Sequence, residues 1–271
     1  MIFSIVEVQV LSAAKTRWCS AHRRVFFLRR EGGTVSTQGG LVASSTVEQY
    51  LKTMFLIERR SGTRCIPMKT LADAMGVTPG TATSMAKHLH REGLIEYLPR
   101  RGTILSDSGR NLAVKVVRRH RLIETFLERI LEYDWSEVHS DAEELEHVVS
   151  DRFVERVDRL LGYPETDPHG DPIPRPDGRF APRELFPLSE AIPGQLLEVA
   201  RLVEDSGEFL QFMKQHGIVP GGSITPTQTS DAAGTVTVIT GGHPDPIALS
   251  RDIAEKVLVL APGSQSTPLV D

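Results

Sequence analysis

The stretch from Thr46 to Leu105 constrains the fold most, because its predicted elements come in a diagnostic order. Apolar residues recur at helical spacing after Thr46, again after Pro67, and again after the turn at 78–81. Two short strands, 94–98 and 103–105, flank a turn at 99–102. Helix, helix, turn, helix and hairpin is the order of a winged helix-turn-helix. The sequence therefore predicts a DNA-reading domain over residues 45–107.

Charge supports this interpretation. Residues 44–105 carry nine Lys or Arg against five Asp or Glu, although the whole chain has a net charge of −4. A local basic excess fits a surface that faces phosphates, with the domain binding another protein as the alternative. No Arg or Asn on the third helix is placed for a bidentate base contact, so we expect mainly phosphate and shape contributions. The candidate DNA contacts are Thr78, Thr81, Thr83, Ser84, Lys87, Arg100 and Arg101.

Two longer helices follow, one from about Ser108 to Leu131 and one from about Ser140 to Leu161. The apolar stripe of the second helix is long, and the core beside the hairpin does not easily cover it all. A homodimer formed through residues 108–163 is the economical explanation, and DNA readers of this class are commonly two-fold. The stripe includes Ala142, Leu145, Val149, Phe153, Val157 and Leu160.

The C-terminal part has a different pattern. A proline-rich linker over 164–187 precedes five short strand-like stretches, interrupted by one helix near 207–216. Short strands with glycine turns favour a small SH3-like β-barrel over 188–261, so the fold class is α+β and mainly α. We interpret residues 1–44 as a poorly ordered extension, with a basic DNA-binding arm as the alternative, and 262–271 as a disordered tail.

Several protein classes are disfavoured. The two cysteines, Cys19 and Cys65, form neither a zinc spacing nor a disulfide framework, so a reducing cytoplasm is expected. The sequence contains no run of 18 apolar residues, so we expect no membrane-spanning helix. The first ten residues are fairly apolar, but they lack the basic region and the cleavage site of a signal peptide. The sequence lacks the HExxH motif that would indicate a metalloprotease.

Glutamate and histidine recur at helical spacing on the two longer helices. Positions separated by three or four residues share one face of a helix. Taken singly, each residue is more simply a surface carboxylate or a core histidine. Together, they predict a site for Mn, Fe, Co or Zn, since these metals accept mixed carboxylate and imidazole ligands. The set consists of His120, Glu124, His139, Glu143, Glu146 and His147.

From about Thr46 to Leu260 the chain resembles the diphtheria toxin repressor family of iron- and manganese-dependent regulators. The matching stretches are VEQYLKTMFLIE, RRHRLIETFLE, VHSDAEELEHVVSD, GDPIP and EFLQF. The resemblance implies a winged helix-turn-helix domain, a helical dimerisation domain and an SH3-like domain, with a divalent metal as corepressor. It also implies two neighbouring metal sites, one from Gln49, Glu143, Glu146 and His147, and the other from His120, Glu124, His139, Glu208 and Gln211.

Three positions depart from the pattern of this family. Gln49 stands where the family usually has Met or Asp, and Glu143 stands where iron-responsive members commonly have Cys. Lys52 stands where manganese-selective members often have Glu, and a protonated lysine cannot bind a metal. These clues disagree about the metal, which stays open between Mn and Fe, with Co, Ni or Zn as substitutes in vitro.

The expected function is that of a cytoplasmic, homodimeric, metal-activated repressor that binds a double-stranded DNA operator and controls metal homeostasis. Metal would link the first helix to the dimerisation helices, so that metal binding and DNA binding are coupled. A DNA-binding protein whose metal site has decayed is the first alternative, consistent with Gln49 and Lys52. A metalloenzyme is the second and weaker one.

Overall fold

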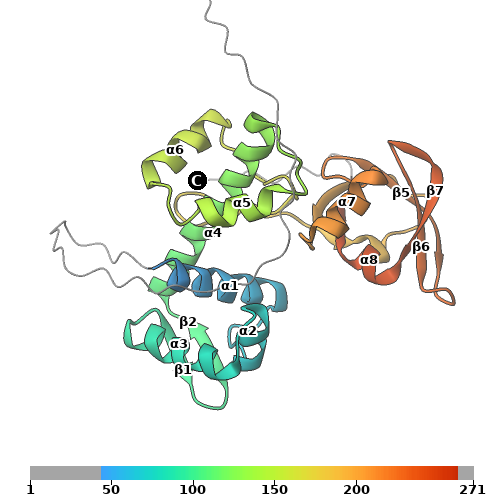
Figure 1. Cartoon of the computed structure of the whole chain (residues 1–271). Helices are drawn as coiled ribbons and strands as arrows, with labels where there is room; N and C mark the ends of the chain where they lie inside the picture. Colours follow the sequence, from blue (N-terminus) through green and yellow to red (C-terminus); the bar gives the residue numbers. More distant parts are fainter. Residues whose placement is uncertain (1–43, 262–271) are drawn as a thin grey trace, which may run out of the picture. The chain divides into compact units, whose positions relative to one another are not determined.

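The computed structural model describes residues 44–261 of the 271-residue chain (Figure 1). The expectations for 1–43 and 262–271, including the basic arm, fall outside the described residues. None of the helices in residues 44–261 combines the length and the hydropathy of a membrane-spanning segment.

The first domain has the predicted winged helix-turn-helix order. Its elements are α1 (Ser45–Ser61), α2 (Met68–Ala74), α3 (Pro79–Arg91), β1 (Ile95–Leu98) and β2 (Gly102–Leu105). The side chain of Ser44 caps α1 by accepting from Val47 N, and Thr78 caps α3 by accepting from Thr81 N. The apolar faces meet in a core that includes Leu51, Met54, Leu71, Leu89 and Leu105.

The hairpin tip is constrained by its backbone. Gly102 pairs with Leu98, and a Cβ at Gly102 would lie 2.2 Å from the carbonyl oxygen of Ile66. Arg100 has a φ of 66°, a left-handed conformation that favours glycine over arginine. The hairpin tip therefore has an arginine at a position where the backbone conformation would favour glycine.

The helical domain consists of α4 (Asp107–Leu131), α5 (Val138–Leu145) and α6 (Asp151–Leu160). The prediction of one continuous helix over 140–161 is wrong, because the chain turns between α5 and α6. Ser150 accepts a hydrogen bond from Phe153 N and so caps the start of α6, with Asp151 in its first turn. His147 consequently lies in the turn rather than within a long helix.

The C-terminal domain is built on a six-stranded antiparallel sheet in the order β3-β8-β4-β5-β6-β7. Its predicted strands and its helix are confirmed, while β3, a 3-10 turn and α8 were not anticipated. The elements are β3 (Phe186–Pro187), η1 (Leu188–Glu190), β4 (Leu197–Leu202), α7 (Gly207–Gln215), β5 (Ser223–Ser230), β6 (Thr235–Thr240), β7 (His243–Ser250), α8 (Arg251–Glu255) and β8 (Val257–Leu260).

The proline-rich segment between the helical and C-terminal domains is fixed against α4. Arg118 donates to the carbonyl oxygen of Pro174 and Arg121 to that of Pro172, each at 2.6 Å. Ile173 is buried in a small core with Leu122 of α4. The segment therefore has defined partners instead of acting as a free spacer.

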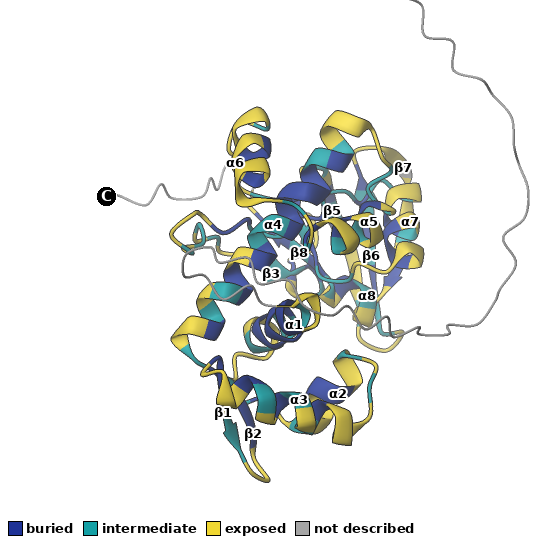
Figure 2. Cartoon of the chain, turned by 60° about the vertical axis from the view of Figure 1, so that its left-hand side comes forward, coloured by how far each residue is buried: buried dark blue, intermediate teal, exposed yellow. Residues whose placement is uncertain are grey.

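Apolar side chains remain exposed on the helical domain. In Figure 2, α6 shows an exposed outer face, and its Leu160 is 61% exposed. Exposed apolar residues of this domain and its borders are Ile130, Leu131, Tyr133, Leu145, Val148, Phe153, Leu160 and Tyr163. Such a concentration is typical of a surface that takes part in binding.

Candidate functional site

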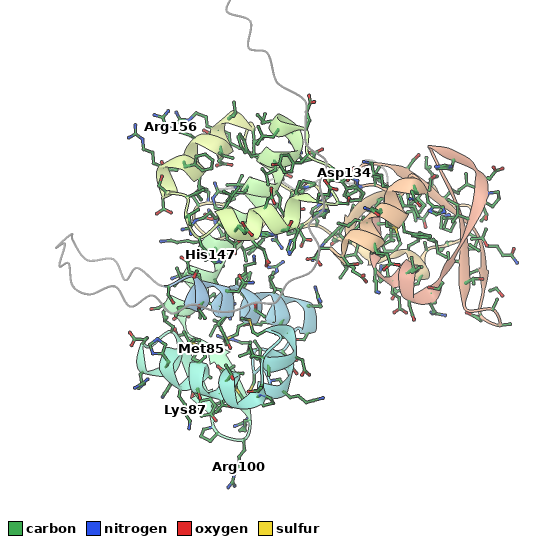
Figure 3. All side chains as sticks on the ribbon, in the orientation of Figure 1. Met85, Lys87, Arg100, Asp134, His147 and Arg156 are labelled. Atoms are coloured by element: carbon green, nitrogen blue, oxygen red, sulfur yellow. The ribbon has the colours of Figure 1, made fainter. Side chains whose placement is uncertain are left out.

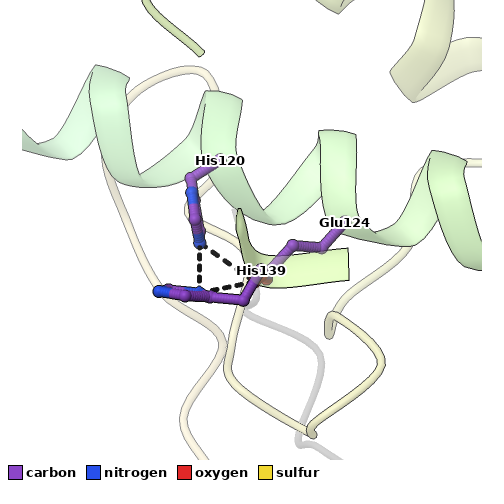
Figure 4. A group of neighbouring side chains, drawn as sticks. All are labelled: His120, Glu124 and His139. Atoms are coloured by element: carbon purple, nitrogen blue, oxygen red, sulfur yellow. Dashed lines mark hydrogen bonds and ion pairs between the residues drawn. The ribbon is translucent and has the colours of Figure 1, made fainter. Parts of the chain in front are cut away.

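Three predicted metal ligands converge between α4 and α5. His120 and Glu124 lie one turn apart on α4, and His139 comes from the first turn of α5. His120 Nε2 lies 2.9 Å from Glu124 Oε1 and 3.2 Å from His139 Nδ1, which is itself 3.2 Å from Glu124 Oε1 (Figure 4). His120 and Glu124 are buried, and His139 is partly exposed. Two imidazole nitrogens and a carboxylate facing one point fit a transition metal.

A second group extends this centre into the proline-rich segment. Asp167 and His169 offer ligand atoms within 4.8 Å of Glu124 and of each other. His169 Nε2 donates to the carbonyl oxygen of Trp135 at 2.8 Å, which leaves Nδ1 without a proton in the neutral ring. Sequence reasoning missed both residues, although the quoted GDPIP stretch begins one residue after His169.

The charges of this centre are strongly coupled. Burial opposes protonation of His120, but the Glu124 carboxylate and hydrogen bonds to Glu124 and Glu146 outweigh it and raise the pKa of His120 to about 9. Burial likewise works against ionisation of Glu124, yet the charge and hydrogen bonds of its histidine neighbours hold its pKa well below the usual range. At neutral pH the metal-free group therefore contains an imidazolium, and a metal must replace its proton.

Nearby Asp167 behaves in the opposite way. Burial, followed by the charges of Asp171 and Glu124, raises the pKa of Asp167 well above its usual range despite Arg121. Asp167 Oδ1 accepts from the backbone N–H groups of His169 and Asp171, each at 2.9 Å. The segment is thus folded around a carboxyl group that faces other acids, an arrangement that an added cation would stabilise.

The second predicted metal site consists of Gln49, Glu143, Glu146 and His147. These residues also lie close together, but their side chains contact other side chains of the protein. Gln49 Nε2 donates to Glu143 Oε1 at 3.2 Å. His147 Nδ1 lies 2.7 Å from Glu48 Oε2. Lys52 Nζ donates to both carboxylate oxygens of Glu146, at 2.9 and 3.0 Å. These contacts join α1 to the C-terminal end of α5 and the turn after it.

In this arrangement Gln49, Glu143, Glu146 and His147 do not fit a divalent metal, because the ammonium of Lys52 lies among them. Lys52 is 4% exposed and Glu146 is fully buried. Removing one partner of a buried ion pair costs about 3–5 kcal/mol. Gln49 Oε1 is the atom still open to a ligand, since it is buried without a hydrogen-bond partner among the described residues. A metal would have to displace Lys52 to use the rest of the set.

Glu208 and Gln211 lie on α7 and are exposed. Among the described residues, no hydrogen bond or ion pair joins either side chain to the His120–Glu124–His139 group. Lys214 on the same helix pairs with Asp134 at 2.5 Å, and this hydrogen bond is the main reason that the pKa of Asp134 falls to about 2. The role of Glu208 and Gln211 as ligands stays a prediction.

The candidate DNA surface lies on α3 and the hairpin. In Figure 3, Lys87 and Arg100 lie away from His147, which is near α1 and α5. Lys87, Arg100 and Arg101 are exposed, and in the described part of the chain their side chains form no ion pair. The hydroxyls of Thr83 and Ser84 donate to the carbonyl oxygens of Pro79 and Gly80, at 2.7 and 3.0 Å.

Thr78, which caps α3, and Thr81 of α3 form a hydrogen bond between their hydroxyl groups, at 2.9 Å. Because the α3 hydroxyls already have partners, they remain suited mainly to accepting a hydrogen bond or to packing on a base methyl group. The three unpaired cations are the natural phosphate contacts.

Comparison with known proteins gives matches along nearly all of the described chain. Three family models follow one another: the N-terminal DNA-binding domain of iron-dependent repressors at 43–103, their metal binding and dimerisation domain at 106–175, and the FeoA domain at 186–261. The iron-dependent repressor IdeR of Mycobacterium leprae is 30% identical over 227 residues, which cover 79% of this chain and 96% of that protein.

Solved structures agree with this match. A manganese-dependent transcriptional repressor in complex with manganese superposes with a TM-score of 0.72 at 34% identity, over 79% of this chain and 99% of the other. ScaR with bound Cd²⁺ gives a TM-score of 0.67 at 33% identity, with the same coverage of both chains.

Proposed function

This chain belongs to the diphtheria toxin repressor family, a family of metal-dependent transcriptional regulators. On that basis, we propose which of its residues bind the metal and the DNA. It represses genes of metal homeostasis in the cytoplasm by binding an operator as a homodimer when Mn²⁺ or Fe²⁺ is held by His120, Glu124 and His139. The observation that carries this proposal is the convergence of these three side chains from two helices.

The metal centre gains support from its surroundings. The carbonyl of Trp135 fixes the tautomer of His169, and such a partner is typical of histidines that hold metals. Asp167 and His169 bring the proline-rich segment to the same carboxylate that anchors the three-residue group. We therefore add these two residues to the candidate ligand set, ahead of the exposed Glu208 and Gln211.

Coupling to DNA follows from the elements that carry the ligands. A divalent ion at this point would supply positive charge shared by α4 and α5. His120 gives up its proton, Glu124 keeps its negative charge, and His139 fixes the start of α5 against α4. Since α1 packs on α4 and contacts the end of α5, this alignment also sets the orientation of the DNA-binding domain.

The partners follow from two surfaces. Lys87, Arg100 and Arg101 meet phosphates, while Thr78, Thr81, Thr83 and Ser84 face the major groove. The exposed apolar set on the helical domain is covered by a second copy of the chain, because two recognition helices must be held at a fixed spacing to read a two-fold operator.

A second candidate function has one observation in its favour. Lys52 and Glu146 join α1 to α5 without metal, as a DNA-binding protein with a decayed metal site would require. We rank it below the metal-dependent reading because the three-residue group on α4 and α5 is complete. A catalytic role ranks lowest, since the sequence carries no motif for a metal-assisted reaction.

The test is a titration of DNA binding with metal. A duplex is selected from a random pool by the Mn²⁺-loaded protein, and its anisotropy is followed with Mn²⁺, Fe²⁺, Co²⁺ and Zn²⁺ under anaerobic conditions. The native chain should bind the duplex more tightly with metal, and His139→Ala should lose most of this response. His243→Ala, at an exposed histidine of the C-terminal domain, is the control. An unchanged response in His139→Ala would contradict the assignment.

A further inference from the structure

We propose that the ammonium group of Lys52 takes the place of a metal ion between α1 and α5. The DNA-binding domain is then joined to the dimerisation helices at this point by a cation that belongs to the chain itself. The inference deepens the proposed function and rests on it, since it assigns the metal response to the other group of ligands alone.

The geometry around Lys52 Nζ is that of a small cation site. Glu146 lies 2.9 and 3.0 Å away through its two oxygens, Glu143 Oε1 lies at 3.5 Å, and His120 Nδ1 lies at 3.2 Å. The two carboxylates around this point are donors that a transition metal uses, while the charged ring of His120 pairs with the same Glu146, at 2.7 Å. A lysine ammonium in that place supplies the positive charge and cannot be removed by a chelator.

Burial makes this arrangement hard to replace. The side chain of Lys52 is 5% exposed and that of Glu146 is fully buried, so water screens their attraction little. A divalent ion that entered here would displace the ammonium and leave it without a partner in a buried place. The carboxylates would gain one cation and lose another, so the exchange offers little net gain in attraction.

The contacts beside Lys52 complete the junction. Gln49 lies three positions before Lys52, on the same face of α1, and its Nε2 donates to Glu143. Glu48 contacts both His147, at 2.7 Å, and Arg119 of α4, at 3.6 Å. Three side chains of α1 thus each have a partner on α5 or the turn after it, and all three contacts form without metal.

This junction has a consequence for regulation. In the metal-free protein, α1 already contacts the end of α5. The position of the DNA-binding domain relative to α5 is therefore partly fixed before any metal binds. The metal response is confined to the alignment of α4, α5 and the proline-rich segment. Removing Lys52 should therefore loosen the metal-free protein, whereas replacing it with a carboxylate should create a metal site that the native chain lacks.

The first experiment measures hydrogen exchange of the full chain in chelator, over the backbone amides of 143–149. Lys52→Met should speed exchange there by at least about tenfold, equivalent to about 1.4 kcal/mol. Lys115→Met, at an exposed lysine of α4, should leave exchange unchanged. Lys52→Gln is the substitute if Lys52→Met does not fold. Unchanged exchange in the folded Lys52 variant would overturn the proposal.

The second experiment counts bound Mn²⁺ by calorimetry. Lys52→Glu should bind one more ion per protomer than the native chain, and adding His147→Ala to Lys52→Glu should remove that ion. His147→Ala alone should leave the native count unchanged. The proposal would be overturned if His147→Ala alone bound one ion fewer than the native chain. It would also be overturned if folded Lys52→Glu bound no additional ion. If the native chain shows no metal-linked DNA binding, the proposed function fails. The exchange experiment contains no metal, so it still tests the role of Lys52 in that case.

Discussion

Glu48 Oε2 lies 2.7 Å from Nδ1 of His147, so a carboxylate of the DNA-binding domain holds a histidine predicted to bind metal. The two residues are 99 positions apart and come from α1 and the turn after α5. Their contact identifies a polar junction between the two domains that does not depend on a metal ion. The ligand role predicted for His147 does not fit this arrangement, in which a carboxylate of α1 holds the ring.

Breaking this contact should destabilise the metal-free protein. Glu48→Gln removes the charge from a hydrogen bond whose partners are both mostly buried, with side chains 12% and 16% exposed. We expect the free energy of unfolding in urea to fall by about 2 kcal/mol, because hydrogen bonds to charged groups contribute on that order. Glu96→Gln, at an exposed glutamate of β1, is the control and should differ little from the native chain. Equal stability of the two variants would contradict the role of Glu48.

The hairpin tip should contribute to DNA affinity at a cost in backbone conformation. Arg100→Gly relieves the left-handed backbone and should leave stability equal to or higher than that of the native chain. It should also weaken binding to all duplexes and reduce the slope of log affinity against log salt by about one. Arg156→Ala, on α6, controls for the loss of one positive charge. An unchanged slope in Arg100→Gly would remove the hairpin from the interface.

The exposed apolar set should be the dimer interface. Val148 is 76% exposed in the protomer, so Val148→Asp should leave the protomer folded. In a dimer the same change buries an unpaired charge, at a cost of several kcal/mol. Sedimentation should show dissociation of Val148→Asp and of Leu145→Asp, but not of Ile192→Asp, an exposed position of the C-terminal domain. Dimers of native strength in the first two variants would place the interface elsewhere.

Metal affinity should rise with pH. The pKa of His120 is raised from its ordinary value of 6.5 to about 9, so its contribution to metal-free stability is fully present below pH 6.5 and is lost as pH rises through 9. A metal must displace this proton, so its apparent affinity should increase between pH 6.5 and 8, by up to about tenfold per pH unit for one proton. Calorimetry in two buffers of different ionisation enthalpy should detect the released proton. A heat of binding that is independent of buffer would contradict this account of His120.

Local signals explain why the order of elements was predictable. Ser44 and Thr78 mark helix starts through their side-chain caps, and Gly102 marks a tight hairpin. The break between α5 and α6 was missed because apolar residues continue through it at helical spacing. Ser150 followed by Asp151 was the available sign of a new helix.

The site was predictable only where its residues share a helix or adjacent helices. His120 and Glu124 are one turn apart, and His139 lies in the first turn of the next helix, so spacing was informative. Asp167 and His169 reach Glu124 because Arg118 and Arg121 fix the proline-rich segment on α4, which no local pattern reveals. The sequence showed that Lys52 could not be a ligand, but its contacts with Glu146 depend on packing between domains.

Metal and DNA are expected to bind the same conformation of the protein, so each should raise the affinity for the other. The affinity of the native chain for Mn²⁺ is measured with and without a saturating selected duplex, and its affinity for the duplex with and without saturating Mn²⁺. DNA should tighten metal binding by the same factor by which metal tightens DNA binding. His139→Ala should lose both effects together. Equal Mn²⁺ affinity with and without DNA would show that metal and DNA do not select the same conformation.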